Sequence, residues 1–260
     1  MSSSRTSSGS PPADFPIVVH PRNPGMPLDP SWVRAVRANL SAIERRAATI
    51  PRRRTVKKEY QAAWLLRAIT LMDLTTLQGD DTPDRVRRLC AKARAPVRED
   101  LLAALDAQGL GIRVAAVCVY HAMVPAAVEA LRGTGIPVAA VSTGFPAGLS
   151  PFPQRVAEIR ASVEAGADEI DVVITRGHVL SGDWQALYDE VRTFREACGD
   201  AHIKVILGTG ELGTLRNVAR ASVVAMMAGA DFIKTSTGKV TPAATLPVTL
   251  VMLEAIRDFH

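Results

Sequence analysis

The 260-residue sequence is poor in cysteine and aromatic residues, and it has no long apolar run. Its three cysteines, Cys90, Cys118 and Cys198, are far apart and form no Cys-x-x-Cys pair, which argues against a disulfide framework or a zinc site. No apolar stretch approaches the roughly 18 residues that span a bilayer, and the first eight residues lack the apolar core of a secretory signal. We therefore expect a soluble cytoplasmic protein with reduced thiols and no membrane partner.

Basic residues outnumber acidic ones, which gives a formal net charge of +5 at pH 7. Much of this charge lies in the run PRRRTVKK at 51–58. Such a run could attract nucleic acid, but aromatic residues make up only 5% of the chain, too few for a stacking surface. We interpret the run as a solvated approach to the next helix, with attraction of phosphate groups as the second interpretation, and expect no nucleic-acid partner.

Residues 1–30 are rich in Ser, Pro and Gly, and this composition predicts a disordered leader. Residues 31–56 are predicted to form an N-terminal helix, over 31–48, followed by the basic approach. The helix is indicated by an apolar stripe: Trp32, Val33, Val36, Leu40 and Ile43. Residues 57–260 then form the main domain, which begins with a helix over about 57–67.

Short apolar runs alternate with amphipathic stretches through the rest of the chain. The predicted strand and helix pairs are 69–74 and 83–93, 112–120 and 124–132, 138–142 and 154–165, 169–175 and 183–198, 203–209 and 214–228, and 232–235 and 246–259. The strands are almost continuously apolar, as expected for parallel strands covered on both faces. The pattern predicts an α/β fold with a parallel sheet, open or closed.

The six predicted βα units are fewer than the eight of a closed (β/α)8 barrel. The sheet is therefore either open and doubly wound, or it belongs to a barrel of which about two units are missing. A chain that ends at His260, at the end of an uncapped helix, fits the second interpretation better.

The sequence FIKTSTGK at 232–239 places Lys234 at the end of a short strand, directly before a Ser/Thr/Gly turn. A carbonyl-attacking amine and a phosphate cradle would lie together there, because hydroxyls and backbone N–H groups bind anions. The alternative is an ordinary surface lysine beside an ordinary turn. Spacing alone does not decide between them.

Charged residues also occur inside two other predicted strands. Alternation places Asp171 on the face opposite Ile170 and Val172, where a carboxylate is costly unless it is paired. Lys204 is a cation within the next strand. Each alone fits a structural role, but together with Lys234 they predict convergence on one cavity.

A glycine pattern at 208–213, GTGELG, matches the G-x-G-x-x-G motif of dinucleotide-binding folds. Asp231 follows at about the spacing of a ribose-binding acid, but it begins a strand instead of ending one, and the unit lies in the middle of a uniform βα series. We interpret the glycines as a tight rim loop that leaves room for a small ligand. Cys118 is either a reactive thiol facing the cavity or, as we favour, a small buried hydrophobe.

The sequence resembles the class I deoxyribose-phosphate aldolases, and in particular their longer, animal-type members. The resemblance rests on LMDLTTL at 71–77, AVCVY at 116–120, TGFPAG at 143–148, EIDVV at 169–173, KVILGTGEL at 204–212 and FIKTSTGK at 232–239. It implies a (β/α)8 barrel in which Lys234 is the Schiff-base lysine, Asp171 belongs to the proton relay, and Thr237 and Gly238 bind phosphate. We count Asp73, Thr75, Cys118, Lys204 and Lys239 as further candidate substrate-binding residues.

The resemblance also implies reversible cleavage of 2-deoxyribose 5-phosphate to glyceraldehyde 3-phosphate and acetaldehyde, without metal or organic cofactor. The sequence departs from the family in two ways: His121 replaces a proline, and the motifs of the seventh and eighth strands are absent. The resemblance implies that the family's seventh strand carries a second lysine, whose charge lowers the pKa of the Schiff-base amine. Because this sequence lacks that lysine, we expect residues 1–260 alone to be essentially inactive. The alternative is a non-catalytic remnant that acts only by association with another chain; a homo-oligomer is left open.

Overall fold

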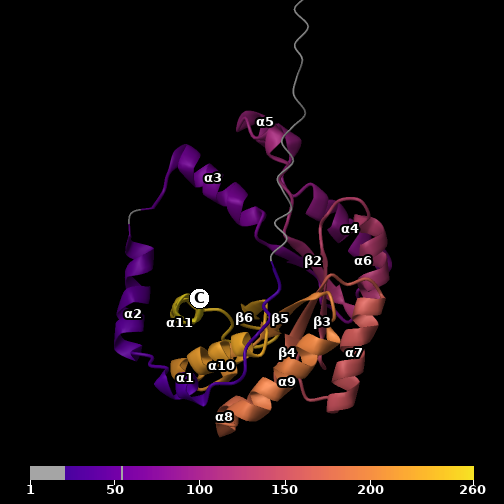
Figure 1. Ribbon diagram of the computed structural model, residues 1–260. Coiled ribbons are helices and arrows are strands. Elements are labelled where there is room, and N and C mark those ends of the chain that lie inside the picture. Colours follow the sequence, from indigo (N-terminus) through magenta and orange to yellow (C-terminus); the bar gives the residue numbers. More distant parts are fainter. Residues whose placement is uncertain (1–20, 54) are drawn as a thin grey trace, which may run out of the picture.

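The computed structural model describes residues 21–53 and 55–260, and its centre is one parallel sheet (Figure 1). The strands pair in chain order. They are β1 (Asp73–Thr75), β2 (Ala116–Tyr120), β3 (Val138–Ser142), β4 (Glu169–Val173), β5 (His202–Ile206) and β6 (Phe232–Lys234). The predicted α/β class and parallel sheet are confirmed. The sheet curls as an incomplete barrel, with β1 and β6 as its two edges.

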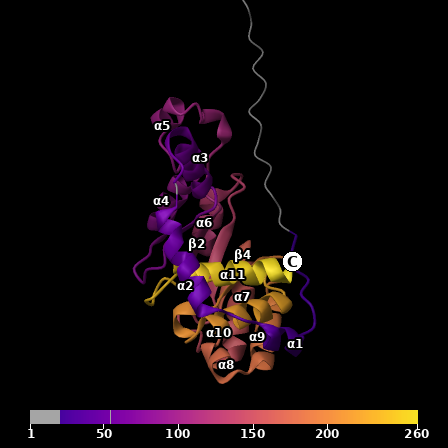
Figure 2. The same ribbon diagram turned by 90° about the vertical axis from the view of Figure 1, so that its left-hand side faces the viewer.

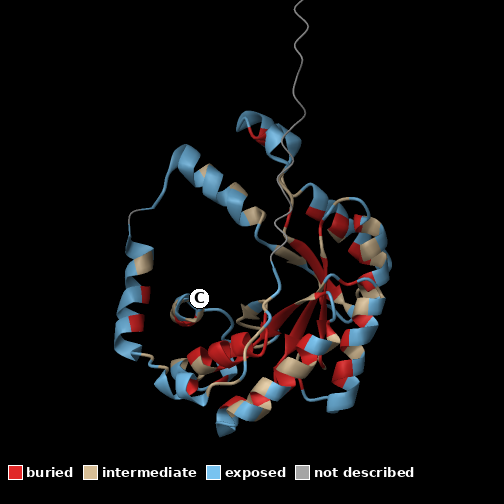
Figure 3. Ribbon diagram, viewed as in Figure 1, coloured by how far each residue is buried: buried red, intermediate tan, exposed pale blue. Residues whose placement is uncertain are grey.

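Helices cover the outer face of the sheet, as Figures 1 and 3 show. They are α4 (Pro83–Arg94), α6 (Val124–Leu131), α7 (Phe152–Glu164), α9 (Trp184–Ala197) and α10 (Leu215–Met227). A further helix, α11 (Leu246–Phe259), packs on α10 beyond the edge strand β6. Four of these helices begin at a side chain that accepts a backbone N–H of the first turn: Thr82, Asp183, Thr214 and Thr245. The main apolar core lies between these helices and the strands.

Two short helices were not predicted, α5 (Glu99–Ala104) and α8 (Arg176–Ser181). The first predicted strand was also misplaced. Helix α3 (Lys58–Ile69) ends inside the range 69–74 that we predicted as strand, and β1 begins only at Asp73. The continuous apolar run across this boundary hides the point at which helix gives way to strand.

The N-terminal region differs from its prediction at two points. Residues 1–20 lie outside the described residues, but 21–29, assigned to the disordered leader, pack against the barrel. Asn23 binds the carbonyls of Met226 and Ala230 through its side-chain amide, and the Met26 N–H donates to Met227. Gly25 has a φ of +69°, and a Cβ there would lie 2.7 Å from the Met227 carbonyl oxygen. The composition did not reveal these contacts.

The single helix predicted over 31–48 is broken into α1 (Pro30–Ala35) and α2 (Leu40–Thr49). Asn39 ends the break by capping α2 through its side chain. Helix α2 packs against α11, where Arg46 pairs with Glu254 at 3.2 Å (Figure 2). The basic residues 52, 53, 57 and 58 are exposed, as expected of a solvated approach, whereas Arg54 lies outside the described residues.

Candidate active site

Alternation along β4 turns Asp171 away from the helices and into the interior of the curled sheet. Its neighbours Ile170 and Val172 belong to the core between sheet and helices. The interior face instead carries a separate small cluster that includes Cys118 and Val141. The predicted orientation of Asp171 is confirmed, and its side chain is completely buried.

Lys234, at the end of β6, reaches Asp171 across the intervening strand β5. Its Nζ lies 2.5 Å from Oδ2 of Asp171. The lysine side chain is 34% exposed, whereas the carboxylate is fully buried. The amine is therefore held by a buried anion while remaining open to a small molecule at the rim of the sheet.

Lys204 is the centre of the same cluster. Its Nζ lies 2.6 Å from Oδ2 of Asp73 and 3.5 Å from Oδ1 of Asp171, and it pairs with Glu169. Because Asp73 is on the first strand and Lys204 on the fifth, this contact crosses the barrel interior. The predicted convergence of Asp171, Lys204 and Lys234 is confirmed by these contacts.

Glu169 is a member of the cluster that the sequence analysis missed. It lies two residues before Asp171, so the same alternation that turned Asp171 inward applied to it. Burial raises the pKa of Glu169; Lys204 opposes this rise, and Asp73 and Asp171 add to it. Five charged groups therefore share the interior: three carboxyls and two amines.

The two amines are held in their charged form. Burial lowers the pKa of Lys234, but Asp171 outweighs burial and leaves that pKa above its ordinary value. Lys204 also opposes the charge on Lys234, because two cations repel each other. The pKa of Lys204 is itself raised, since Asp171, Glu169 and Asp73 together overcome its burial.

Cys118 faces this cluster from β2, with its Sγ 3.9 Å from Oδ2 of Asp171. Burial, together with the charge of Asp171, raises its pKa to about 12. The thiol is therefore neutral near pH 7, which makes Cys118 a small buried wall of the site. Its position at the site agrees with the prediction, and its environment favours the inert interpretation over the reactive thiol.

The predicted phosphate-binding residues follow β6. Thr237 is buried, Gly238 has a φ of +76°, and a Cβ at Gly238 would meet no other atom within 4 Å. Two other candidates are held outside the charged cluster. The Lys239 Nζ donates to the Leu77 carbonyl at 2.6 Å, and the exposed Thr75 donates its hydroxyl to the Asp73 carbonyl.

Local backbone geometry and packing account for the glycines at 208–213. Gly208 has a φ of +67°, in the left-handed region that favours glycine. A Cβ at Gly210 would lie 2.2 Å from the Pro242 carbonyl oxygen, so the loop after β6 packs directly on this glycine. The glycines thus form the tight loop we expected, but the space we expected them to leave for a small ligand is filled at Gly210 by the chain itself.

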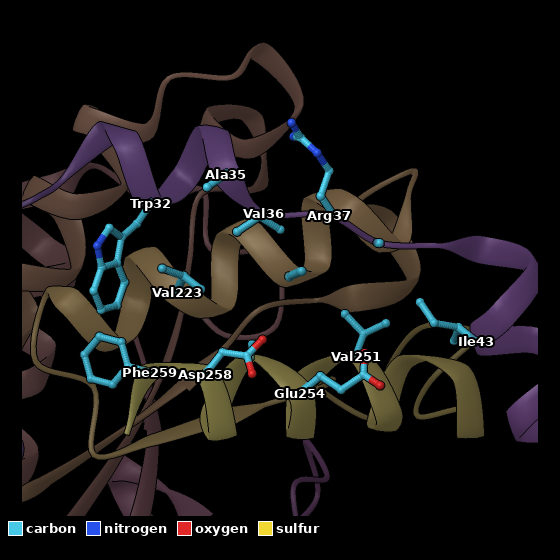
Figure 4. Close-up of a pocket in the computed structure, with 13 residues that line it drawn as sticks. Trp32, Ala35, Val36, Arg37, Ile43, Val223, Val251, Glu254, Asp258 and Phe259 are labelled. Carbon is cyan, nitrogen blue, oxygen red and sulfur yellow. The ribbon is translucent and has the colours of Figure 1, made fainter.

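A pocket of about 470 Å³ lies elsewhere, on the outer wall of the fold. It opens between α1, α10 and α11, and Trp32, Val223 and Glu254 are among its lining residues (Figure 4). None of the five charged groups of the interior cluster lines it. The charged cluster inside the sheet is therefore separate from this pocket.

Comparison with known protein families assigns the chain through residues 67–260, which match the family model described as DeoC/LacD family aldolase. The chain belongs to this aldolase family. The matched residues contain all five members of the charged cluster: Asp73, Glu169, Asp171, Lys204 and Lys234.

Curated relatives of this aldolase include the deoxyribose-phosphate aldolase of Homo sapiens. It is 62% identical over 239 residues, which are 91% of this chain and 75% of the human protein. The deoxyribose-phosphate aldolase of Mus musculus is also 62% identical, over 90% of this chain and 74% of its own. The resemblance drawn from the motifs is confirmed.

Solved structures agree with the fold of this aldolase. A structure described as a putative deoxyribose-phosphate aldolase from Coccidioides immitis matches with a TM-score of 0.67 at 26% identity, covering 89% of this chain and 82% of that one. A tetrameric deoxyribose phosphate aldolase from Aeropyrum pernix matches with a TM-score of 0.60 at 23% identity, over 75% and 74% of the two chains. The second likeness bears on the fold alone.

Residues 21–53 and 55–260 of this aldolase contain neither a candidate metal-binding cluster nor a membrane-spanning helix. Within that part of the chain, no group of three or more His, Cys, Asp or Glu side chains is arranged to hold a metal ion. Over the same residues, no helix is both long and apolar enough to cross a membrane.

Proposed function

We propose that this chain is a deoxyribose-phosphate aldolase that cleaves 2-deoxyribose 5-phosphate through an imine on Lys234. The observation that carries the proposal is the partly exposed Lys234 amine held 2.5 Å from the buried Asp171 carboxylate. Identity of 62% to animal deoxyribose-phosphate aldolases supports the substrate. An enzyme of this kind needs no metal or organic cofactor, because the imine itself withdraws electrons.

The reaction begins when Lys234 loses its proton and its free amine adds to the C1 aldehyde of the open-chain sugar. Loss of water gives an iminium ion. Removal of the proton from the C3 hydroxyl then lets the C2–C3 bond break, and its electron pair forms an enamine on the lysine side. Glyceraldehyde 3-phosphate leaves, the enamine is protonated at C2, and water releases acetaldehyde from Lys234.

Asp171 is the proposed proton shuttle in these steps. It lies within hydrogen-bond reach of the Lys234 amine, so it holds the proton on the unreacted amine and can transfer protons in the steps that follow attack. Lys204 is proposed to assist the reaction, because its charge opposes the charge on Lys234. It supplies some of the electrostatic activation that we had assigned to a lysine of the seventh strand, so we propose activity for this chain although the sequence alone led us to expect none.

The turn after β6 is the proposed phosphate site, with the Thr237 hydroxyl and the Gly238 backbone as donors. Lys239 would join it by leaving the Leu77 carbonyl, to which it now donates. We further propose that the protein is cytoplasmic and that it forms a homo-oligomer, as the Aeropyrum pernix protein does. The alternative of a non-catalytic remnant is not favoured, because the charged cluster is intact.

Borohydride trapping tests the proposal. The chain is incubated with acetaldehyde and borohydride, and peptide mass spectrometry then locates the ethyl group. We expect the label on Lys234, no label there in Lys234→Met, and unchanged labelling of Lys234 in Lys239→Met, which removes a lysine outside the charged cluster. Label on Lys204 or Lys239 in place of Lys234 would contradict the assignment.

A further inference from the structure

A buried ion pair on the helix side of the sheet connects to the ends of the two strands nearest Asp171. Arg155 of α7 and Glu190 of α9 are both almost fully buried, and the Arg155 Nη1 lies 2.7 Å from the Glu190 Oε1. The guanidinium also lies over the Phe194 ring, 4.9 Å from its centroid. The sequence analysis interpreted both residues as parts of amphipathic helices and assigned them no role.

The β3–β4 ladder changes character at its C-terminal end. Its last paired residues are Ser142 and Val172. The next residue, Thr143, has a φ of +63°, and its hydroxyl oxygen accepts the Val173 N–H at 2.7 Å. A side chain has therefore replaced the backbone acceptor, and the carbonyls of Thr143 and Val173 are left without their ladder donors. The Thr143 hydroxyl lies 3.0 Å from the Val173 carbonyl oxygen.

Arg155 donates to both carbonyls. Its Nε donates to the Thr143 carbonyl at 3.1 Å, and its Nη2 donates to the Val173 carbonyl at 2.7 Å. Glu190 binds Thr175, which lies two residues after Val173. Its carboxylate accepts the Thr175 N–H at 2.8 Å and the Thr175 hydroxyl at 2.6 Å. The Arg155 guanidinium and the Glu190 carboxylate thus fix the C-terminal ends of β3 and β4 together.

The fixed segment is the one that carries Asp171. Val173 lies two residues further along β4, on the same face of the sheet, and the loop that follows β3 packs on it: a Cβ at Gly148 would lie 3.1 Å from a Val173 methyl group. A twist of this strand end would move the Asp171 carboxylate relative to Lys234. Displacements of about 1 Å can cost about a hundredfold in rate.

Stability alone does not account for such a pair. Buried ion pairs can often be replaced by apolar residues of similar volume without loss of stability, because desolvation offsets their attraction. The arginine here makes geometric contacts that an apolar residue could not make. We infer that Arg155 and Glu190 are positioning residues for the aldolase reaction, which set the orientation of Asp171 against Lys234 from outside the site.

This inference rests on the proposed function for its kinetic part, but its test needs no substrate. The pKa of Lys234 depends on Asp171 of β4, Cys118 of β2 and Lys204 of β5. If Asp171 is displaced, the Lys234 amine loses its closest anion and becomes more reactive at a given pH. Competitive acetylation at several pH values, followed by mass spectrometry, reports this reactivity, with the exposed Lys92 of α4 as the internal reference.

Two variants are compared with the unaltered chain. Arg155→Met combined with Glu190→Leu removes both charges and avoids an unpaired buried ion, whereas Arg155→Lys keeps the charge but cannot span both carbonyls. Val191→Ala, a buried change on the same helix as Glu190, is the matched control for loss of packing. His178 also faces Glu190, with its Nε2 4.0 Å from Oε1, and it is not substituted in any of these variants.

We expect Lys234 acetylation near neutral pH to rise about tenfold in the double variant, which corresponds to about one pKa unit, and to rise in the same direction in Arg155→Lys. Val191→Ala should leave it unchanged. With substrate, kcat should fall about tenfold or more while KM stays within about threefold. An acetylation profile like that of the unaltered chain in folded Arg155→Lys or in the folded double variant would overturn the inference. Failure to trap an imine on Lys234 would contradict the proposed function. The acetylation result would then still decide whether Arg155 and Glu190 position Asp171.

Discussion

Lys234 and Asp171 meet at 2.5 Å although their strands are not neighbours in the sheet. Strand β5 lies between them, and its own lysine, Lys204, lies 3.5 Å from the other oxygen of Asp171. One buried carboxylate is therefore shared by two amines of different exposure. The more exposed amine, Lys234, is suited to attack a carbonyl, and the buried one, Lys204, is suited to hold the carboxylate in place.

Replacing Asp171 by Asn should separate imine formation from turnover. Turnover should fall about a hundredfold or more, the usual scale for losing general acid–base help. Imine trapping at pH 7 should instead become faster, because Asp171 is the anion that holds the Lys234 proton. Glu169→Gln is the control, since Glu169 pairs with Lys204. Near-normal turnover in Asp171→Asn would make the residue structural.

The rate of imine formation should rise with pH through the neutral range. The pKa of Lys234 is raised, so at pH 7 most of the amine is protonated, and below that pKa the free-amine fraction grows about tenfold per pH unit. Trapping with acetaldehyde and borohydride, quenched at short times from pH 6 to pH 9, measures this dependence. A rate that is flat over that range would indicate an amine that is already free.

Lys204→Met should strongly destabilise the fold, because it leaves three carboxyls without their shared cation. Breaking a buried ion pair from one side typically costs about 3–5 kcal/mol. The folded-state pKa of Lys204 is raised above its ordinary value of 10.5, so its stabilisation is fully present below about pH 10.5 and lost as pH rises beyond that.

Urea unfolding from pH 7 to pH 11 measures both effects of Lys204→Met. The difference in free energy of unfolding between the two proteins should stay constant up to about pH 10 and then shrink. Arg46→Met, which breaks the exposed pair with Glu254, is the control and should cost less than about 1 kcal/mol. Equal costs for the two variants would mean that the interior cluster contributes no more than a surface pair.

The sequence predicted the sheet well because its strands are short apolar runs bounded by Gly and Pro. Alternation also predicted the inward direction of Asp171 from its apolar neighbours alone. It did not identify Glu169, which stands at the start of the strand, where a charged residue is usually solvated. Only the curl of the sheet, which brings β1 opposite β5, shows that Glu169 and Asp73 share Lys204.

Contacts made by long side chains were the least predictable. Lys239 follows the phosphate turn directly in sequence, yet its flexible side chain reaches the Leu77 carbonyl. Arg155 and Glu190 lie on helices whose charged residues look solvated in the sequence, and only the packing of α7 against α9 buries them. Residues 21–29 were wrongly assigned to a disordered leader, because composition does not reveal the specific hydrogen bonds that they make.

The basic approach at 52–58 should bind nucleic acid only weakly and in a strongly salt-dependent way, as expected of phosphate contacts alone. The structure adds a test, since Tyr60 and Trp64 of the next helix are 67% and 65% exposed. If stacking contributed, Trp64→Ala would weaken binding by about 1–3 kcal/mol. We expect Trp64→Ala to change nothing in filter binding with mixed single-stranded RNA. Binding that resists 0.5 M salt would contradict this prediction.

Gly210→Ala should disturb the proposed phosphate site through the loop that follows β6. The added Cβ would lie 2.2 Å from the Pro242 carbonyl oxygen, a backbone atom that cannot move without shifting the loop. Overpacking of this kind typically costs about 1–3 kcal/mol. Pro242 lies three residues beyond Lys239, so the shift should reach the phosphate turn and raise the KM for deoxyribose 5-phosphate.

The measurement compares deoxyribose 5-phosphate with unphosphorylated deoxyribose in Gly210→Ala. If the turn binds phosphate, kcat/KM should fall by about tenfold for the phosphorylated sugar, about 1.4 kcal/mol, and change little for the other. Gly79→Ala is the control, because a Cβ there would meet no other atom within 4 Å. Equal losses for the two sugars would place the damage at the lysine cluster and argue against a phosphate site at Thr237 and Gly238.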